Sequence, residues 1–270
     1  MAAKQEEVHA ALTALYAPGG ALDHPPAELI KYFDDSVVIR TAKAYMDLQG
    51  DVTVGGHAVV VTAGPPGAGK SEARETMVLK GYRVIDSDKA KDMLLKEAEA
   101  QGLLAYRKLH VLPDGRPVGV RELASHIHSI STRTADVVRQ SALAAGENVV
   151  IEGTLSWAPI IDVYIDDFFN AGYEGLEVVD VEAPVDVAIQ RARSRWWDGR
   201  QSDLELGGRF VPDTEIKKFY SEHSWQSCCA ANALALAERA ATDLGSGTLR
   251  RFDVDAKTGS LTLSSETIFK

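Results

Sequence analysis

The segment from Gly64 to Ser71 reads Gly-Pro-Pro-Gly-Ala-Gly-Lys-Ser and fits the pattern G-x-x-x-x-G-K-[ST]. In this pattern glycines let successive backbone N–H groups converge on phosphate oxygens. We expect Lys70 to reach the β- and γ-phosphates of a nucleotide and the Ser71 hydroxyl to bind Mg²⁺. The segment therefore predicts a triphosphate site, with ATP as the expected nucleotide and GTP as the alternative. Its predicted lining is Gly64, Gly67, Ala68, Gly69, Lys70 and Ser71.

Two later apolar segments end in carboxylates. Residues 84–88 read Val-Ile-Asp-Ser-Asp, and residues 148–152 read Asn-Val-Val-Ile-Glu. If both are parallel strands, their carboxyl ends lie at the ligand-binding edge of the sheet. A carboxylate there can accept the proton of a substrate hydroxyl as it attacks phosphorus, or help to hold Mg²⁺. We favour this role for Asp88, the alternative being that it only caps the following helix. Glu152 ends an apolar strand and needs a ligand, metal or partner there, and Thr154 follows it.

Several arginines lie close together in an otherwise acidic chain, namely Arg191, Arg193, Arg195, Arg200 and Arg209. Planar guanidinium groups suit the charge that develops on a transferring phosphoryl group. A lid over about residues 191–212 is a way to bring Arg200 or Arg209 over the nucleotide and to exclude water. We favour Arg195 and Arg209 for this function. For Arg193 we favour a solvated helix face that pairs with nearby acids.

The elements that position these residues alternate from residue 57 onward. Short apolar runs predict strands at 58–63, 82–85, 148–152 and 176–181, and helices are expected at 70–81, 88–102, 123–146, 159–171, 185–198 and within 213–243. Residues 249–264 are expected to form a β-hairpin. This alternation indicates an α/β fold, with a parallel sheet flanked by helices and a closing hairpin. Residues 1–56 are predicted to be a helical N-terminal extension, and residues 57–270 the catalytic domain.

Composition narrows the class of protein. The 270 residues include 29 Lys and Arg against 39 Asp and Glu, a formal charge of −10, which disfavours a nucleic-acid or membrane partner. The two cysteines, Cys228 and Cys229, are adjacent and are interpreted as inert thiols. His126 and His128 would fall on different faces of a helix, a poor spacing for a metal pair. We expect a cytoplasmic protein, since the N-terminus lacks the apolar core of a signal peptide.

Other nucleotide-binding classes lack their signatures. No N-K-x-D segment is present to read guanine, and no apolar strand closes in adjacent Asp-Glu as in motor ATPases. The sequence also contains no G-x-S-x-G nucleophile elbow. These absences leave the small-molecule kinases, which transfer the γ-phosphoryl group of ATP to a hydroxyl.

Taken together, the motifs resemble the zeta toxin family, bacterial P-loop kinases related to chloramphenicol phosphotransferase. The resemblance lies in the order and spacing of segments 62–71, 84–88, 148–154, the arginine run ending at Arg195, and 209–212. It implies an adenylate-kinase-like P-loop fold and phosphorylation of the sugar 3′-hydroxyl of UDP-N-acetylglucosamine. The implied roles are a general base for Asp88, a grip on the transferring phosphoryl group for Lys70, Arg195 and Arg209, and substrate contacts for Asp88, Ser131, Asp136, Glu152 and Thr154.

One position departs from the family pattern. Where the family often has arginine two residues after the Glu-Gly-Thr triplet, this chain has Ser156, which weakens the case for an anionic diphosphate sugar. A kinase of a different small alcohol, similar to an antibiotic phosphotransferase, is one alternative. A nucleotide-dependent switch without phosphoryl transfer is another, and residual ATPase activity a third. The resemblance also implies an antitoxin protein as a partner.

Overall fold

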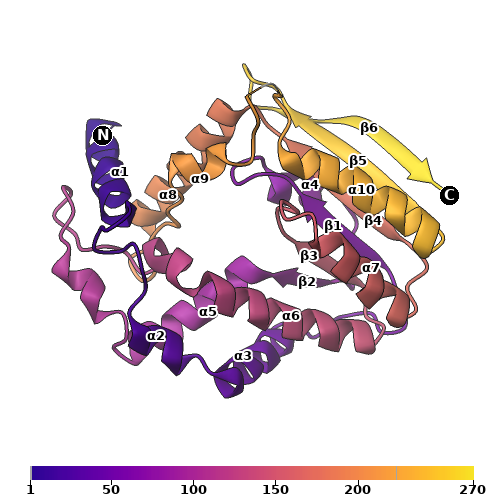
Figure 1. Ribbon diagram of the computed structural model, residues 1–270, viewed down its shortest axis with the longest axis horizontal. Coiled ribbons are helices and arrows are strands. Elements are labelled where there is room, and N and C mark those ends of the chain that lie inside the picture. Colours follow the sequence, from indigo (N-terminus) through magenta and orange to yellow (C-terminus); the bar gives the residue numbers. More distant parts are fainter. Residues whose placement is uncertain (1, 223) are drawn as a thin grey trace. The chain divides into compact units, whose positions relative to one another are not determined.

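The computed structural model describes residues 2–222 and 224–270, and its central feature is a six-stranded sheet in the order β2-β3-β1-β4-β5-β6. Strands β1 to β5 run parallel where they pair, and β6 returns antiparallel to β5 (Figure 1). This is the predicted fold class, a mostly parallel sheet flanked by helices and closed by a hairpin. The strands are β1 Val59–Ala63, β2 Arg83–Asp86, β3 Val149–Glu152, β4 Leu176–Glu182, β5 Gly247–Val254 and β6 Leu261–Phe269.

The central strands are buried because helices cover both of their faces. Every residue of β1 is buried, as are the first three of β3 and all but one of β4. Continuous runs of Val and Ile suit strands that are buried on both faces. Strands in which apolar and polar residues alternate suit a sheet with one face exposed to solvent. β6 differs, because most of its side chains are exposed at the edge of the sheet.

The helices follow the predicted order with altered boundaries. They are α1 Ala2–Tyr16, α2 Ala27–Tyr32, α3 Asp35–Asp47, α4 Lys70–Glu75, α5 Ser87–Ala100, α6 His128–Ala144, α7 Ile160–Asn170, α8 Val185–Ser202, α9 Asp213–Lys217 and α10 Cys228–Asp243. Two 3₁₀ helices, Ala105–Leu109 and Arg121–Ile127, lie between α5 and α6.

Three predicted helices are shorter or broken. The helix at 70–81 ends at Glu75, where the Thr76 hydroxyl bonds the Ala73 carbonyl at 2.7 Å. Local bonding of this kind competes with helix continuation. The helix expected from residue 123 starts at His128, after a 3₁₀ segment. The material at 213–243 divides into α9 and α10, and Ser227 caps α10 by accepting a bond from the Cys229 N–H.

The chain divides into two compact units. The first comprises residues 1–44, 87–134 and 193–212, and the second comprises residues 45–86, 135–192 and 213–270. Three of the five boundaries fall inside α3, α6 and α8, and the other two directly precede α5 and α9. Residues 1–44 and 45–56 thus belong to different units, and the boundary expected at residue 56 stays a prediction.

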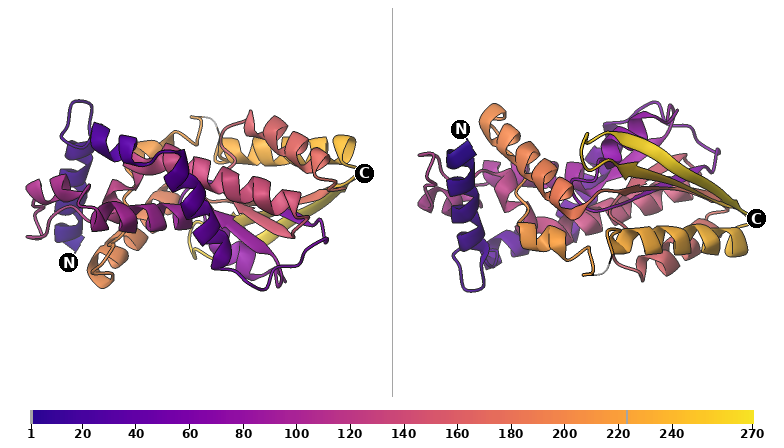
Figure 2. Two further views of the ribbon diagram at one scale, coloured as in Figure 1. Left: turned by 90° about the horizontal axis from the view of Figure 1, so that it is seen from below. Right: turned by 90° about the horizontal axis from the view of Figure 1, so that it is seen from above.

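The second unit contains the sheet. α10 packs on β4 and β5 and also contacts α7, and Figure 2 shows these two helices on the same face of the sheet. The first unit is helical, and α5 packs against the 3₁₀ helix at 121–127. Its core includes Val8 and Leu12 of α1 and Leu94 and Leu95 of α5, all fully buried. The N-terminal helix is therefore part of that core.

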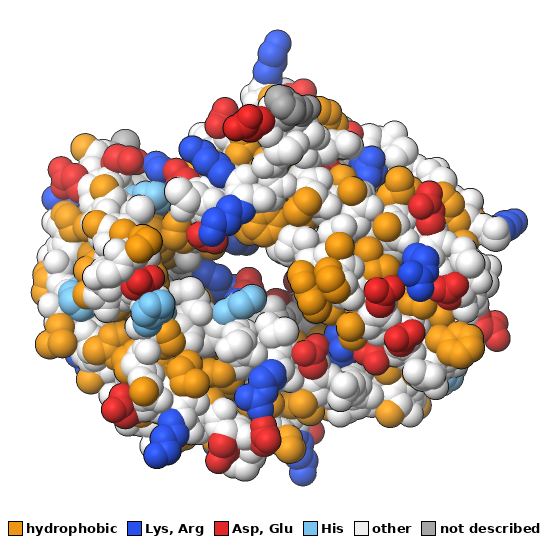
Figure 3. Space-filling model, viewed as in Figure 1, with side chains coloured by type: hydrophobic (Ala, Val, Ile, Leu, Met, Phe, Trp, Pro, Cys, Tyr) orange, Lys and Arg blue, Asp and Glu red, His pale blue; other side chains and the backbone are white. Residues whose placement is uncertain are grey.

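Charged side chains are interspersed on the face of the molecule shown in Figure 3, where Lys and Arg lie among Asp and Glu. Within the described ranges 2–222 and 224–270, no helix is long and apolar enough to cross a bilayer.

Candidate nucleotide and phosphoryl-transfer site

The phosphate loop joins β1 to α4 in the second unit, and its glycines adopt conformations that other residues avoid. Gly64, Gly67 and Gly69 have φ angles of 129°, 84° and 103°. A Cβ on Gly64 would lie 2.2 Å from the Val181 carbonyl oxygen, and one on Gly67 would lie 2.1 Å from that of Ala188. Because both obstacles are backbone atoms, no side chain can replace these glycines without moving β4 or α8.

Lys70 lies across its own loop. Its Nζ donates to the carbonyl oxygens of Gly64 at 2.7 Å and Pro65 at 3.0 Å. Ser71 follows in the first turn of α4 and is exposed. The sequence thus places an ammonium group and a hydroxyl at the predicted cradle, with the hydroxyl accessible to solvent.

The start of the loop is hydrogen-bonded to the segment that follows β3. The Gly64 N–H donates to the Thr154 carbonyl oxygen at 3.0 Å, and the Gly153 N–H donates to the Thr62 hydroxyl at 3.1 Å. The Thr154 hydroxyl lies 3.0 Å from that of Ser156. These contacts set the predicted substrate residue Thr154 beside the phosphate loop.

Glu152 ends β3 directly opposite Asp86, the last residue of β2, in the register of the parallel pair. The Glu152 carboxylate forms an ion pair with Arg74, which lies one turn after Lys70 on α4. The expected need for a partner at this charged strand end is thus met by a residue that the sequence analysis did not single out. Arg74 and Glu152 side chains are 27% and 18% exposed.

Asp88 lies in the first turn of α5, in the first unit, and is the centre of a second cluster. Arg209 contacts it twice, through an ion pair with its carboxylate and a 2.9 Å bond to its carbonyl oxygen. Lys91 donates to the same carboxylate at 3.0 Å. Burial raises the pKa of Asp88, but Arg209 and Lys91 outweigh this effect, and the pKa falls to about 2. Asp88 is therefore an anion at neutral pH.

Arg209 is held by a second carboxylate as well, since it bonds Asp92 at 2.8 Å. Arg195 has an exposed side chain on α8, and its charge adds to the lowering of the Asp88 pKa. The structure thus brings three of the predicted catalytic residues, Asp88, Arg195 and Arg209, into one electrostatic cluster. Their roles stay predictions.

Two predicted substrate residues have partners inside their own units. Ser131 is fully buried, and its hydroxyl donates to the His128 carbonyl oxygen at 2.8 Å. Asp136 pairs with Arg139 at 3.0 Å, and Arg139 also pairs with Asp167 at 3.0 Å. Burial raises the pKa of Asp136, partly offset by Arg139. The assignment of Ser131 and Asp136 to substrate binding stays a prediction.

Arg191 contacts the phosphate loop, although the sequence analysis gave it no role of its own. Its guanidinium donates to the Ala68 carbonyl oxygen at 3.3 Å and to that of Gly259, in the β5–β6 turn. The turn lies 68 residues away in sequence. The available signal was its position one helical turn before Arg195, which puts both on the same helix face.

The order of these motifs along the chain matches a known protein family. The family model described as Zeta toxin matches residues 53–240, more than half of the chain and including both the phosphate loop and Arg209. The chain belongs to the zeta toxin family. No curated protein sequence matches it.

Solved structures share the fold at low identity. One is from the PezAT chromosomal toxin-antitoxin system of the human pathogen Streptococcus pneumoniae, with 11% identity, a TM-score of 0.55, and coverage of 86% of this chain and 82% of that one. A second is an AvrRxo1-ORF1:AvrRxo1-ORF2 structure with sulphate ions, with 17% identity, a TM-score of 0.51, and coverage of 88% and 66%. A third is an AvrRxo1-ORF1:-ORF2 structure with ATP, with 17% identity, a TM-score of 0.50, and coverage of 88% and 65%. Together with the family, this likeness of fold supports a nucleotide-dependent kinase.

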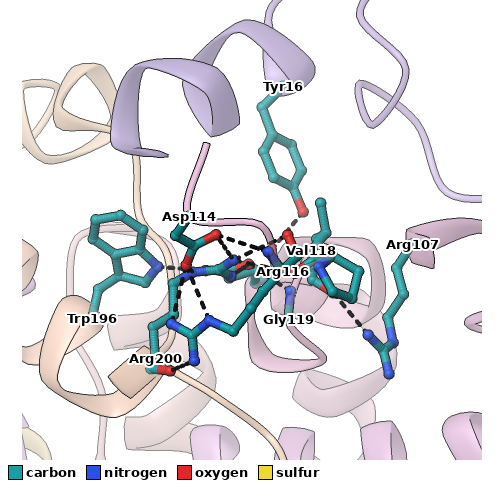
Figure 4. A network of polar contacts seen from close by, with 10 residues as sticks. Tyr16, Arg107, Asp114, Arg116, Val118, Gly119, Trp196 and Arg200 are labelled. Atoms are coloured by element: carbon teal, nitrogen blue, oxygen red, sulfur yellow. Dashed lines mark hydrogen bonds and ion pairs between the residues drawn. The ribbon is translucent and has the colours of Figure 1, made fainter. Parts of the chain in front are cut away.

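Arg200 has a structural role in this zeta toxin family member, and its interpretation as a lid residue is wrong. Its side chain is 3% exposed and pairs with Glu122 and Asp114 at 2.7 and 2.8 Å. The Trp196 indole donates to Glu122 at 2.8 Å, and Figure 4 shows this closed network. A buried guanidinium with its donors satisfied in this way holds α8 to the loop at 110–120.

Two other sequence interpretations fit the structure. Arg193 pairs with Glu6 of α1 at 2.7 Å, as expected of an arginine on a helix face with acidic neighbours. His126 is buried, and its ring nitrogens lie 2.7 and 2.8 Å from the Tyr106 hydroxyl and the Leu22 carbonyl oxygen. Both side chains are therefore occupied by structural contacts.

Proposed function

We propose that this chain is an ATP- and Mg²⁺-dependent kinase that transfers the γ-phosphoryl group to a hydroxyl of a small molecule. The proposed acceptor is UDP-N-acetylglucosamine or a similar sugar nucleotide. The observation on which the proposal depends is the loop between β1 and α4, where glycines fit closely against β4 and α8 and Lys70 lies across them. Membership of the zeta toxin family supports the same reaction.

The chemistry divides among a few side chains. The loop amides and Lys70 would bind the β- and γ-phosphates, as loops of this pattern do. Ser71 would hold Mg²⁺, since this residue is exposed in the first turn of α4 and its hydroxyl can supply an oxygen ligand. When bound, the ion neutralises negative charge on the phosphates.

Asp88 supplies the base in this proposal. The acceptor oxygen bonds to the γ-phosphorus, the bond from that phosphorus to the β–γ bridging oxygen breaks, and ADP leaves. The hydroxyl proton passes to the Asp88 carboxylate, which is ionised because its pKa is about 2. A carboxylate of such low pKa is a weak base, so we assign it chiefly to orienting the hydroxyl and accepting its proton late.

A partner protein forms part of the proposal. The related structures come from a toxin-antitoxin system and from two-component ORF1:ORF2 complexes. By analogy, we propose that an antitoxin binds this chain. Co-purification with the product of a neighbouring gene would test this.

The direct test is incubation with γ-labelled ATP, Mg²⁺ and a panel of acceptors that includes UDP-N-acetylglucosamine, free N-acetylglucosamine and an aminocyclitol or phenylpropanoid antibiotic. We expect label in UDP-N-acetylglucosamine, and a loss of at least a thousandfold for Lys70→Ala. Label in the antibiotic alone would change the acceptor class. ATP binding without label in any acceptor would replace the kinase with a nucleotide-dependent switch, and release of free phosphate alone would indicate an ATPase.

A further inference from the structure

The Arg74–Glu152 ion pair joins two functional parts of the second unit. Arg74 belongs to α4, the helix whose first turn contains Lys70 and Ser71. Glu152 ends β3 and precedes Thr154, whose carbonyl oxygen accepts the Gly64 N–H. The guanidinium therefore connects the helix of the phosphate loop to the strand end that is predicted to meet the acceptor.

Two acidic residues meet at this strand end. Asp86 and Glu152 end adjacent strands in direct register, and like charges on neighbouring strands repel. The Tyr45 hydroxyl lies at this strand end, where it donates to the Val84 carbonyl oxygen at 3.0 Å and accepts from the Asp86 N–H at 3.0 Å. Burial raises the pKa of Tyr45 to about 12, and the charges of Asp86 and Glu152 add to the rise. The ion pair with Arg74 offsets the charge of Glu152 at this place.

We define the acceptor wall as Asp86, Glu152, Thr154 and Ser156, all partly exposed. Its two carboxylates would repel an acceptor that itself has phosphate groups, such as a nucleotide sugar. An Arg–carboxylate pair that is mostly buried is a strong, directional interaction, so it also fixes the rotamer of the glutamate. Removing one partner of such a pair leaves the other charge uncompensated.

We infer that Arg74 is a positioning residue that sets both the charge of the acceptor wall and the orientation of Glu152. This inference rests on the proposed kinase function and deepens it. Arg74 admits an anionic acceptor by neutralising Glu152, and it holds the Glu152 oxygens in a fixed place for hydrogen bonds from acceptor hydroxyls. In this proposal Arg74 does not contact the transferring phosphoryl group. Its loss should therefore affect acceptor binding more than ATP binding.

The test is steady-state kinetics with ATP and UDP-N-acetylglucosamine for wild type, Arg74→Gln, Arg74→Lys and the double variant Arg74→Gln/Glu152→Gln. We expect Arg74→Gln to raise the acceptor KM at least tenfold, with the ATP KM changed less than threefold. Arg74→Lys should recover part of the loss. The double variant should bind the acceptor better than Arg74→Gln alone, because the uncompensated carboxylate has gone.

The matched control is Arg239→Gln, which removes an exposed arginine paired with Asp162 and Asp243 in the same unit. The inference fails if Arg74→Gln raises the acceptor KM no more than this control does, or if the double variant is no better than the single one. Should wild type label no acceptor at all, the proposed function fails first and the inference falls with it. Thermal unfolding of each variant separates misfolding from a change in KM.

Discussion

The phosphate loop and the Asp88–Arg209 cluster are built in different ways. The loop is a backbone feature: three glycines with positive φ, tight contacts with neighbouring carbonyl groups, and one lysine folded over them. The cluster is a side-chain feature, in which Arg209 and Lys91 surround one carboxylate and lower its pKa to about 2. A backbone site tolerates almost no added atom, whereas a side-chain cluster keeps its shape only while the charges balance.

The largest expected effect comes from removing the charge at the centre of the cluster. Asp88→Asn should lower phosphoryl transfer about a thousandfold, since general-base catalysis typically contributes 10²–10⁴-fold. ATP affinity should change less than threefold, because the amide leaves the loop untouched. Transfer is measured with labelled ATP, and affinity by calorimetry.

Asp92→Asn sharpens this result. It removes the other carboxylate that holds Arg209 but leaves the proposed base in place. We expect the rate of phosphoryl transfer to fall about tenfold or less. An equal loss in both variants would indicate that Asp88 acts only by positioning Arg209.

A smaller effect is expected from adding one methyl group to the loop. Gly67→Ala puts a Cβ 2.1 Å from the Ala188 carbonyl oxygen at a φ of 84°, so both strain and a clash oppose the native loop. We expect a loss of about 3 kcal/mol in the free energy of unfolding or an equivalent loss of ATP affinity. Chemical denaturation and calorimetry measure the two.

The matched control is Gly172→Ala, at a φ of 77° with no atom within 4 Å of the added Cβ. This variant introduces the backbone strain without the clash, and its free energy of unfolding should fall by about 1 kcal/mol. If the two variants behave alike, the close fit of the loop against α8 has no energetic consequence.

The smallest expected effect is an acid titration of the cluster. The pKa of Asp88 is lowered from 3.8 to about 2, so its ion pairs stabilise the fold fully above pH 3.8 and progressively less as the pH falls toward 2. Between pH 6 and 2, thermal unfolding should therefore show a smaller acid loss for Asp88→Asn than for wild type. The acid limb of the transfer rate should likewise show no Asp88 titration above pH 4. A limb near pH 6 that disappears in Asp88→Asn would contradict the low pKa.

Sequence patterns predicted the features that depend on residues adjacent in the sequence. The phosphate loop, the apolar strands and the closing hairpin each rest on a short run of residues, and all three are present in the structure. The partners of Asp88 could not be predicted in the same way, because Arg209 lies 121 residues beyond it and the pattern does not record which acid an arginine meets. The same applies to Arg74, whose ion pair with Glu152 spans 78 residues. Arg200 was misjudged because a buried guanidinium and an exposed one look identical in a sequence.

The β5–β6 turn is linked to the phosphate loop through one arginine. Arg191 bonds the Gly259 carbonyl oxygen in that turn and the Ala68 carbonyl oxygen in the phosphate loop. Truncation before residue 255 would remove this brace along with β6. A fusion partner attached after Lys270 would instead emerge beside Gly247, at the end of β5 and β6 away from this turn, because Phe269 pairs with Gly247. A tag or fluorophore attached there should therefore leave the contact between Arg191 and the phosphate loop in place.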